Sequence, residues 1–134
     1  MSEIVVVDTN IFISALISRN ADILRTLTDP NISFVTPNFR VAELFEHSPR
    51  IQEKSHIDRE DLLKVLTIMI GQVRLIDDAF ISIGSWVEAR RLTRDVDMDD
   101  IAFVALALEL EATLWTRDER LKLHLSRYGF SKFF

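Results

Sequence analysis

The chain has 134 residues, 48% hydrophobic and 28% charged, and its 21 acids outnumber its 16 bases, giving a formal net charge of −5 at pH 7. This length and composition predict a single globular domain over residues 1–134, and the acidic balance argues against tight binding of a polyanion through bulk charge. The chain contains no cysteine, which excludes disulfides, a thiolate nucleophile and a zinc site built on sulfur.

The first half of the chain alternates strand and helix patterns. Residues 4–7 form a continuous β-branched run, which is typical of a strand covered on both faces in a parallel sheet. Asn10 and Asn38 are expected to cap helices, and Asp58 with Asp61 resembles a capping box. The elements expected up to residue 69 are a strand at 4–7, helices at 10–17 and 22–28, a strand at 32–35, and helices at 38–46 and 58–69.

The second half continues this alternation. Gly129 ends the last helix, and residues 130–134 are a candidate fifth strand. Strands that alternate with helices predict parallel pairing, and therefore a three-layer α/β/α domain with a mainly parallel sheet of four to five strands. The elements expected are a strand at 73–76, one helix at 77–92 opened by Asp77 and Asp78, an apolar helix at 101–110, a strand at 113–116 and a helix at 117–125.

The composition also bears on location. No run reaches the roughly 18 apolar residues of a membrane span. Residues 1–3 lead directly into the first strand without the basic region of a signal peptide. We therefore expect a cytoplasmic protein with no membrane partner.

Four carboxylates are expected at one edge of the sheet. Asp8 follows the first strand and Asp118 follows the strand at 113–116, and the carboxyl ends of parallel strands meet at the same edge. Asp100 lies in the first turn of a helix antiparallel to that last strand, so it opens onto this edge too. Glu43 lies in a helix that begins there. The four side chains are therefore expected to converge.

Such a cluster predicts a divalent cation, because like charges raise each other's pKa and need compensation. Oxygen ligands favour Mg²⁺ or Mn²⁺, which can activate a water and stabilise a leaving oxygen. Each acid also has a purely structural alternative. Asp8 can begin an Asx turn, Asp118 can cap its helix, Glu43 can be a solvated helix residue, and residues 95–100 can be an acidic turn.

Four segments of the chain resemble the motifs of PIN-domain ribonucleases, a family that includes VapC-type toxins. Residues 4–16, IVVVDTNIFISAL, resemble the opening motif, and residues 41–44, VAEL, resemble the second motif with its single glutamate. Residues 97–108, DMDDIAFVALAL, resemble the third motif and residues 114–118, LWTRD, the fourth. The likeness spans nearly the whole chain. The order of the motifs makes it specific.

The resemblance implies a PIN-like fold and a set of site residues. Asp8, Glu43, Asp100 and Asp118 would be the catalytic, metal-binding acids, and Asp97 would be a further metal ligand. The choice among the acids at 97, 99 and 100 stays open, with Asp100 favoured because it starts the apolar turn of its helix. The supporting residues are expected to be Thr9, Asn10, Asp99 and Thr116. The chain departs from the family where Met98 replaces a common proline, and where Arg117 and Glu111 replace glycines.

Arginine dominates the basic residues, and its planar guanidinium suits phosphate. Arg117, beside Asp118, and Arg94, just before the acidic run, are the candidates for RNA binding. Solvated helix faces are the alternative for this type of residue. The three histidines show no metal-ligand spacing and are expected at the surface.

The resemblance implies a metal-dependent endoribonuclease, with Mg²⁺ or Mn²⁺ as cofactor and RNA as substrate. It further implies the toxin of a type II toxin–antitoxin pair, with an antitoxin partner and a homodimer. The alternative is a catalytically silent PIN-fold protein that binds or regulates. Removing the five proposed site acids from the 21 leaves 16, equal to the number of bases, so the acidity of the chain would largely be the site itself.

Overall fold

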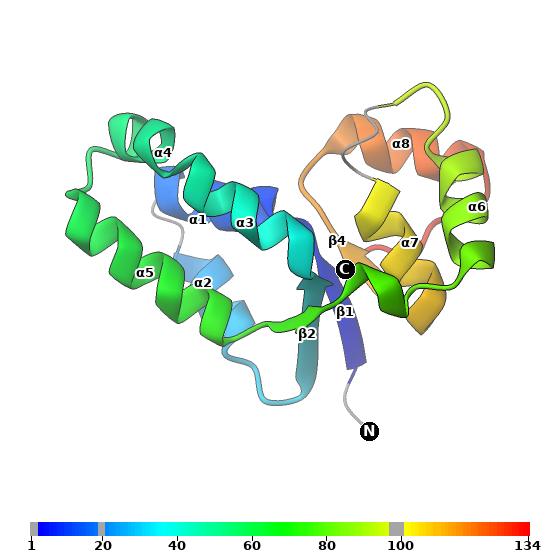
Figure 1. The fold of residues 1–134 in the computed structure, drawn as a ribbon, viewed down its shortest axis with the longest axis horizontal. Coiled ribbons are helices and arrows are strands. Elements are labelled where there is room, and N and C mark those ends of the chain that lie inside the picture. Colours follow the sequence, from blue (N-terminus) through cyan, green and yellow to red (C-terminus); the bar gives the residue numbers. More distant parts are fainter. Residues whose placement is uncertain (1–2, 19–20, 97–100) are drawn as a thin grey trace.

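A parallel sheet of four strands forms the centre of the fold (Figure 1). The computed structural model describes residues 3–18, 21–96 and 101–134. The strands are β1 (Glu3–Val7), β2 (Ile32–Pro37), β3 (Arg74–Ile76) and β4 (Thr113–Trp115), in the order β3-β2-β1-β4. Because β1 lies between β2 and β4, the residues that follow it are flanked by strand ends on both sides. The parallel four-stranded sheet confirms the expected pairing.

Helices cover both faces of this sheet, which confirms the three-layer α/β/α architecture (Figure 1). The side chains of β1 alternate between two cores. Val5 and Val7 pack with Phe12 and Leu62 on one face, while Val6 packs with Val104 on the other. The first face is covered by α1 (Asn10–Ser18), α2 (Ala21–Leu27), α3 (Asn38–Glu46), α4 (Ser48–Ser55) and α5 (Arg59–Gly71), and the second by α6 (Ile83–Leu92), α7 (Ile101–Leu110) and α8 (Glu119–Arg127).

The single helix expected at 77–92 is wrong. The structure has a short 3₁₀ helix, η1 (Asp78–Phe80), followed by α6. Two caps in succession divide the segment. The Asp77 carboxylate accepts the Ala79 N–H at 2.9 Å, and the Ser82 hydroxyl accepts the Ser85 N–H at 3.3 Å.

Helix α4 was not expected from the sequence, and it proves important for the site. It contains Pro49 and a single large apolar residue, Ile51, so it lacks the apolar stripe of a typical surface helix. Pro49 lies in the first turn, where a helix needs no N–H donor. Two expected caps are also wrong. Pro37, not Asn38, is the N-cap of α3, and Asp58 is at the N-cap of α5 without a side-chain hydrogen bond.

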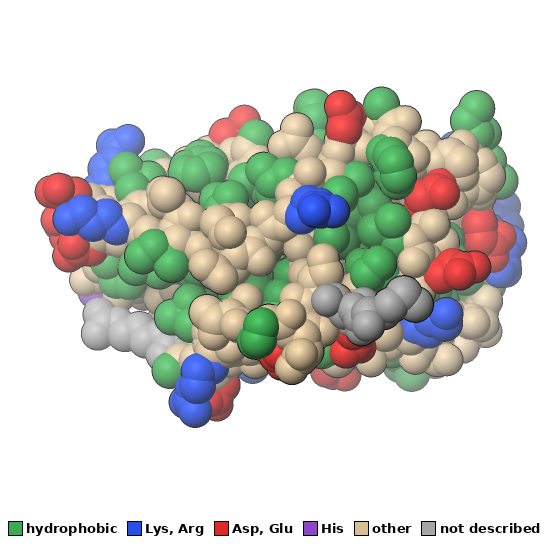
Figure 2. Space-filling view, turned by 90° about the horizontal axis from the view of Figure 1, so that it is seen from below, with side chains coloured by type: hydrophobic (Ala, Val, Ile, Leu, Met, Phe, Trp, Pro, Cys, Tyr) green, Lys and Arg blue, Asp and Glu red, His purple; other side chains and the backbone are tan. Residues whose placement is uncertain are grey.

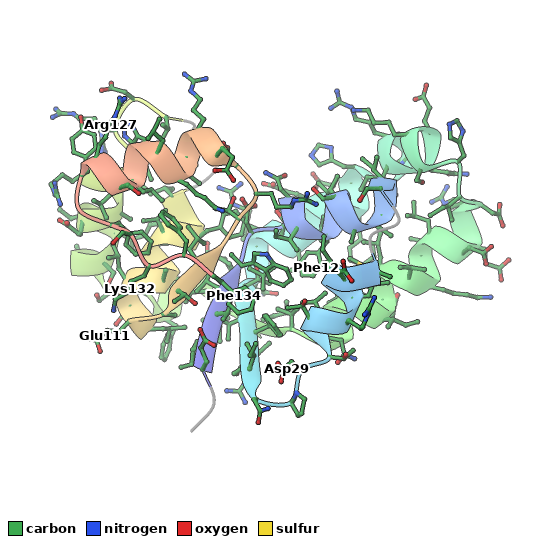
Figure 3. The ribbon with its side chains drawn as sticks, turned by 180° about the vertical axis from the view of Figure 1, so that it is seen from behind. Phe12, Asp29, Glu111, Arg127, Lys132 and Phe134 are labelled. Atoms are coloured by element: carbon green, nitrogen blue, oxygen red, sulfur yellow. The ribbon has the colours of Figure 1, made fainter. Side chains whose placement is uncertain are left out.

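The fifth strand expected at 130–134 is reduced to one bridge, between Leu114 and Phe133. Phe134 then packs edge-on against Trp115, with ring centroids 5.2 Å apart, at the back of the sheet (Figure 3). Aromatic packing therefore fixes this segment in place of a full ladder. Within the described ranges, no helix is long and apolar enough to cross a membrane.

Candidate functional site

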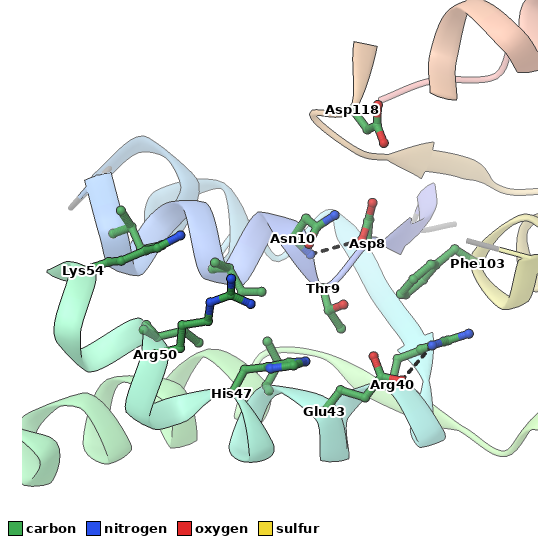
Figure 4. A pocket seen from close by; sticks show the side chains of 14 residues that line it. Asp8, Thr9, Asn10, Arg40, Glu43, His47, Arg50, Lys54, Phe103 and Asp118 are labelled. Carbon is green, nitrogen blue, oxygen red and sulfur yellow. Dashed lines mark hydrogen bonds and ion pairs between the residues drawn. The ribbon is translucent and has the colours of Figure 1, made fainter. Parts of the chain in front are cut away.

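Asp8 and Asp118 lie beside each other at the carboxyl ends of β1 and β4 (Figure 4). Val7 of β1 pairs with Trp115 of β4, and the Asp8 N–H donates to the Trp115 carbonyl at 2.9 Å. Thr116 joins the two acids. Its hydroxyl donates to Asp8 Oδ2 at 2.8 Å and accepts the Asp118 N–H at 3.2 Å. The parallel register of the sheet therefore brings together residues that are 110 positions apart.

The carboxylate of Asp8 is buried, with 1% of the residue exposed. Burial raises the pKa of Asp8 above its ordinary value, and the nearby Asp118 raises it further. Hydrogen bonds from the Asn10 N–H, at 3.1 Å from Oδ1, and from Thr116 oppose this rise in pKa, as does the positive charge of Arg40. Asp8 is therefore an acid whose ionised form is costly unless positive charge lies close to it.

Asp118 has a second task at the start of α8. Its Oδ1 accepts the Leu121 N–H at 3.1 Å, which makes it the N-cap of this helix. The structural role expected as an alternative for this acid is therefore present. It leaves Oδ2 without a printed partner in the described part of the chain, on the side of the cavity that Asp118 lines.

Glu43 lies across the cavity from Asp8, on α3, and its carboxylate is paired (Figure 4). Arg40 donates from Nη1 to Glu43 Oε1 at 2.7 Å, and only 15% of the Arg40 side chain is exposed. The charge of Arg40 also lowers the pKa of Asp8 and of Asp78. Arg40 therefore provides positive charge inside a site that the sequence predicts to be acidic.

A cavity of about 460 Å³ connects these groups. The acids lie toward one end of it, and basic side chains from α3 and α4 line the rest (Figure 4). The volume is that of a typical small-ligand site. The residues lining the cavity are Asp8, Thr9, Asn10, Ile13, Ile17, Arg40, Glu43, Leu44, His47, Arg50, Ile51, Lys54, Phe103 and Asp118.

The structure brings five of the predicted site residues to this cavity: Asp8, Thr9, Asn10, Glu43 and Asp118. Thr116 supports two of them from below, by the bonds to Asp8 and Asp118. The predicted ligands Asp97 and Asp100 and the predicted supporting residue Asp99 lie outside the described residues. Among the residues that are described, no three acids or histidines form a metal-ligating group, since Glu43 is paired with Arg40.

The two arginines predicted to bind RNA do not line this cavity. Arg117 is exposed beside Asp118, and Arg94 is exposed in a separate surface hollow with Arg90 and Arg91. The basic residues that do line the cavity were missed by the sequence analysis: Arg40, His47, Arg50 and Lys54. Their spacing of three or four residues was the available signal, but it crosses the unexpected helix α4.

The donor set at the acidic end fits a hard divalent cation. Every side-chain donor there is an oxygen, from the carboxylates of Asp8 and Asp118 and the hydroxyl of Thr9. A buried carboxylate with a raised pKa, beside a second carboxylate, is the situation that a cation relieves. Nitrogen and sulfur ligands are not required.

Comparisons with known proteins follow the same direction. A sequence model of the PIN domain matches residues 6–127. Among solved structures, a chain in the crystal structure of VapBC2 from Rickettsia felis bound to a DNA fragment from their promoter is similar, with a TM-score of 0.71 and 19% identity, covering 90% of this chain and 92% of that chain. At this identity the likeness shows a common fold. A search of curated proteins finds no match.

The raised pKa of Asp8 predicts that Asp8→Asn stabilises the metal-free protein at neutral pH. The protonated acid is favoured in the folded state, so stability falls as pH rises through the folded pKa of Asp8, and the neutral amide avoids this loss. In thermal melts with EDTA, we expect Asp8→Asn to raise the Tm by a few degrees at pH 7. The difference from wild type should vanish below about pH 4, where both states are protonated.

The control for this measurement is Glu46→Gln, an exposed acid on α3. It should change the free energy of unfolding by less than about 0.5 kcal/mol at either pH. A loss of stability in Asp8→Asn that is equal at pH 4 and pH 7 would show that burial does not dominate the energetics of Asp8.

Proposed function

We propose, since the chain belongs to the PIN domain family, that it is a metal-dependent endoribonuclease that hydrolyses RNA phosphodiester bonds. One observation supports this most: the buried carboxylate of Asp8, bound through Thr116 to the segment of Asp118, at the acidic end of a cavity whose other walls are basic. The products expected are a 5′-phosphate and a 3′-hydroxyl.

The proposed ligands of one or two Mg²⁺ or Mn²⁺ ions are Asp8, Glu43, Asp100 and Asp118, with Asp97 as a further ligand. When bound, the cation would supply Lewis acidity, which lowers the pKa of an attacking water and stabilises the leaving oxygen. The chain's own residues set the geometry. Thr116 and the Asn10 N–H orient the Asp8 carboxylate, and the helix cap fixes Asp118. Thr9, buried at the same edge, is a supporting residue in this proposal.

The pairing of Glu43 with Arg40 favours a second candidate, a PIN-fold protein without catalysis that binds or regulates. In such a protein Arg40 would permanently replace the cation. Calorimetry separates the two candidates, because a silent protein should not bind Mn²⁺ in a way that Asp8→Asn abolishes.

We further propose a homodimer and an antitoxin partner, as the toxin of a type II pair. The similar structure from Rickettsia felis is a VapBC2 assembly, which supports the antitoxin. Large apolar side chains are exposed on η1 and α6, at spacings of three and four residues: Phe80, Ile83 and Val87, with 82% of Ile83 exposed. Such a patch is typical of an interface.

Cleavage of a structured RNA tests the nuclease proposal. Purified protein with Mn²⁺ should produce fragments with 5′-phosphates, and EDTA should abolish them. Asp8→Asn and Asp118→Asn should each lower the rate by more than the roughly 10- to 100-fold that loss of an outer partner of a metal ligand costs. Glu46→Gln is the matched control for Glu43→Gln on the same helix. Cleavage that persists in EDTA, or products with cyclic phosphates, would refute the proposal.

Arg40→Gln should tighten Mn²⁺ binding by roughly tenfold in calorimetry, because it removes a cation from the site and releases the Glu43 carboxylate. Arg25→Gln is the control, since Arg25 forms a similar 2.9 Å pair with Asp22 on α2, but in the open. An unchanged or weaker Mn²⁺ affinity in Arg40→Gln would mean that Arg40 does not compete with the metal.

The dimer can be tested by light scattering. The wild-type chain should have twice its monomer mass of 15.5 kDa, and Ile83→Glu should return it to a monomer. Ile68→Glu, which changes an equally exposed type of residue on α5, should stay dimeric. A monomeric wild type, or a dimeric Ile83→Glu, would rule out this interface.

A further inference from the structure

One row of side chains along α3 and α4 forms a wall of the cavity. Arg40, Glu43, His47, Arg50 and Lys54 follow one another at spacings of three or four residues, which places them on one side of consecutive helical turns. The row crosses from one helix to the next because His47 is both the C-cap of α3 and the N-cap of α4. Figure 4 shows it running from Lys54, at the far end, toward Asp8 and Asp118.

The opposite wall comes from α1 and is apolar beyond its first turn. Asn10, Ile13 and Ile17 line the cavity at the same spacing of three or four residues. Ile51 of α4 is buried against the core beneath them. The cavity therefore presents cations on one side and aliphatic surface on the other, and it ends at the two acids.

The cations at the far end of the row have no acidic partner. Neither Arg50 nor Lys54 forms an ion pair with any acid in the ranges that the structure describes, and both are exposed. Cations on other helices are paired differently. Arg25, Lys64, Arg91 and Lys122 each lie within 4 Å of an acid on their own helix. Positive charge is thus left available at this cavity, in a chain whose net charge is −5.

We propose that Arg50 and Lys54, with His47, bind backbone phosphates of single-stranded RNA next to the bond that is cut, while Ile13 and Ile17 contact its sugars or bases. The proposal rests on the proposed nuclease function. His47 and Lys54 are seven residues apart, about 10 Å along a helix, so the row can contact more than one phosphate. Contacts of this kind position a strand without reading its sequence.

An RNA strand fits this cavity better than an acidic peptide does. The row leads directly to the acids proposed to cut a phosphodiester, which gives the phosphate contacts a purpose. The aliphatic wall suits sugars and base faces, whereas an acidic peptide would present carboxylates to it. Guanidinium and ammonium groups bind phosphate strongly by charge-assisted hydrogen bonds.

The salt dependence of RNA binding tests the proposal. Binding of a fluorescein-labelled single-stranded oligouridylate is measured by anisotropy in EDTA, with Asp8→Asn in every protein so that no RNA is cut. Each lost phosphate contact on a single strand lowers the slope of log K against log salt by about 0.7. Arg50→Gln with Lys54→Gln should therefore lower the slope by about 1.4 and weaken binding on the order of tenfold at low salt.

The matched control is Arg59→Gln with Lys64→Gln, which removes one arginine and one lysine from exposed positions on α5. It should leave the slope unchanged. An equal loss of slope in this control, a wild-type slope in the Arg50 and Lys54 variant, or no RNA binding by the parent protein would overturn the proposal. So would oligoglutamate binding that is tighter than RNA binding and that depends on Arg50 and Lys54.

The two proposals can fail separately. If the slope falls as expected but wild type with Mn²⁺ does not cut RNA, the nuclease function is wrong and the RNA site stands. If RNA is cut while the slope is unaffected by Arg50 and Lys54, the strand follows another path.

Discussion

The hydrogen bond from Thr116 to the buried carboxylate of Asp8 is the interaction on which the site depends. It forms because β1 and β4 are parallel neighbours with Val7 opposite Trp115, so that the residues just beyond both strands meet. A slip of one residue in this register would turn Thr116 to the other side of the sheet. The same hydroxyl accepts the N–H of Asp118, so one side chain fixes both acids.

This arrangement stores an uncompensated charge in the fold. Asp8 is buried, and its hydrogen bonds only partly offset the cost of ionising it there. Arg40 lies close enough to lower the pKa of Asp8, while its own hydrogen bond is given to Glu43. Glu43 thus has two states available in principle, one paired with Arg40 and one with a cation, and the nuclease requires the second.

Net charge turns out to be a poor guide to the partners of this chain. The bulk balance of −5 disfavours RNA, yet the acids at the sheet edge and the free cations of α4 lie in one cavity. Phosphate approaching along α4 meets positive charge first. Local arrangement therefore decides what the cavity can bind, and the sum over the whole chain does not.

The sequence was sufficient for the sheet and for two of the site acids. The β-branched run before Asp8 and the parallel pairing rule place Asp8 and Asp118 at one edge, and the structure has both there. The basic wall could not be predicted, because Pro49 and the lack of an apolar stripe concealed α4. Nor could the Arg40 pair, since a carboxylate's partner depends on side-chain rotamers. Arg94 was the wrong arginine for this cavity because the choice followed closeness in sequence to the acidic run.

The claim that Asp8 and Asp118 share one divalent cation is tested most directly by diffraction from crystals grown with Mn²⁺, recorded at the manganese absorption edge. We expect an anomalous peak in contact with carboxylate oxygens of both residues, and the remaining ligands around it would decide among Asp97, Asp99 and Asp100. A peak that touches neither Asp8 nor Asp118, or the absence of any peak at their edge of the sheet at saturating Mn²⁺, would contradict the claim.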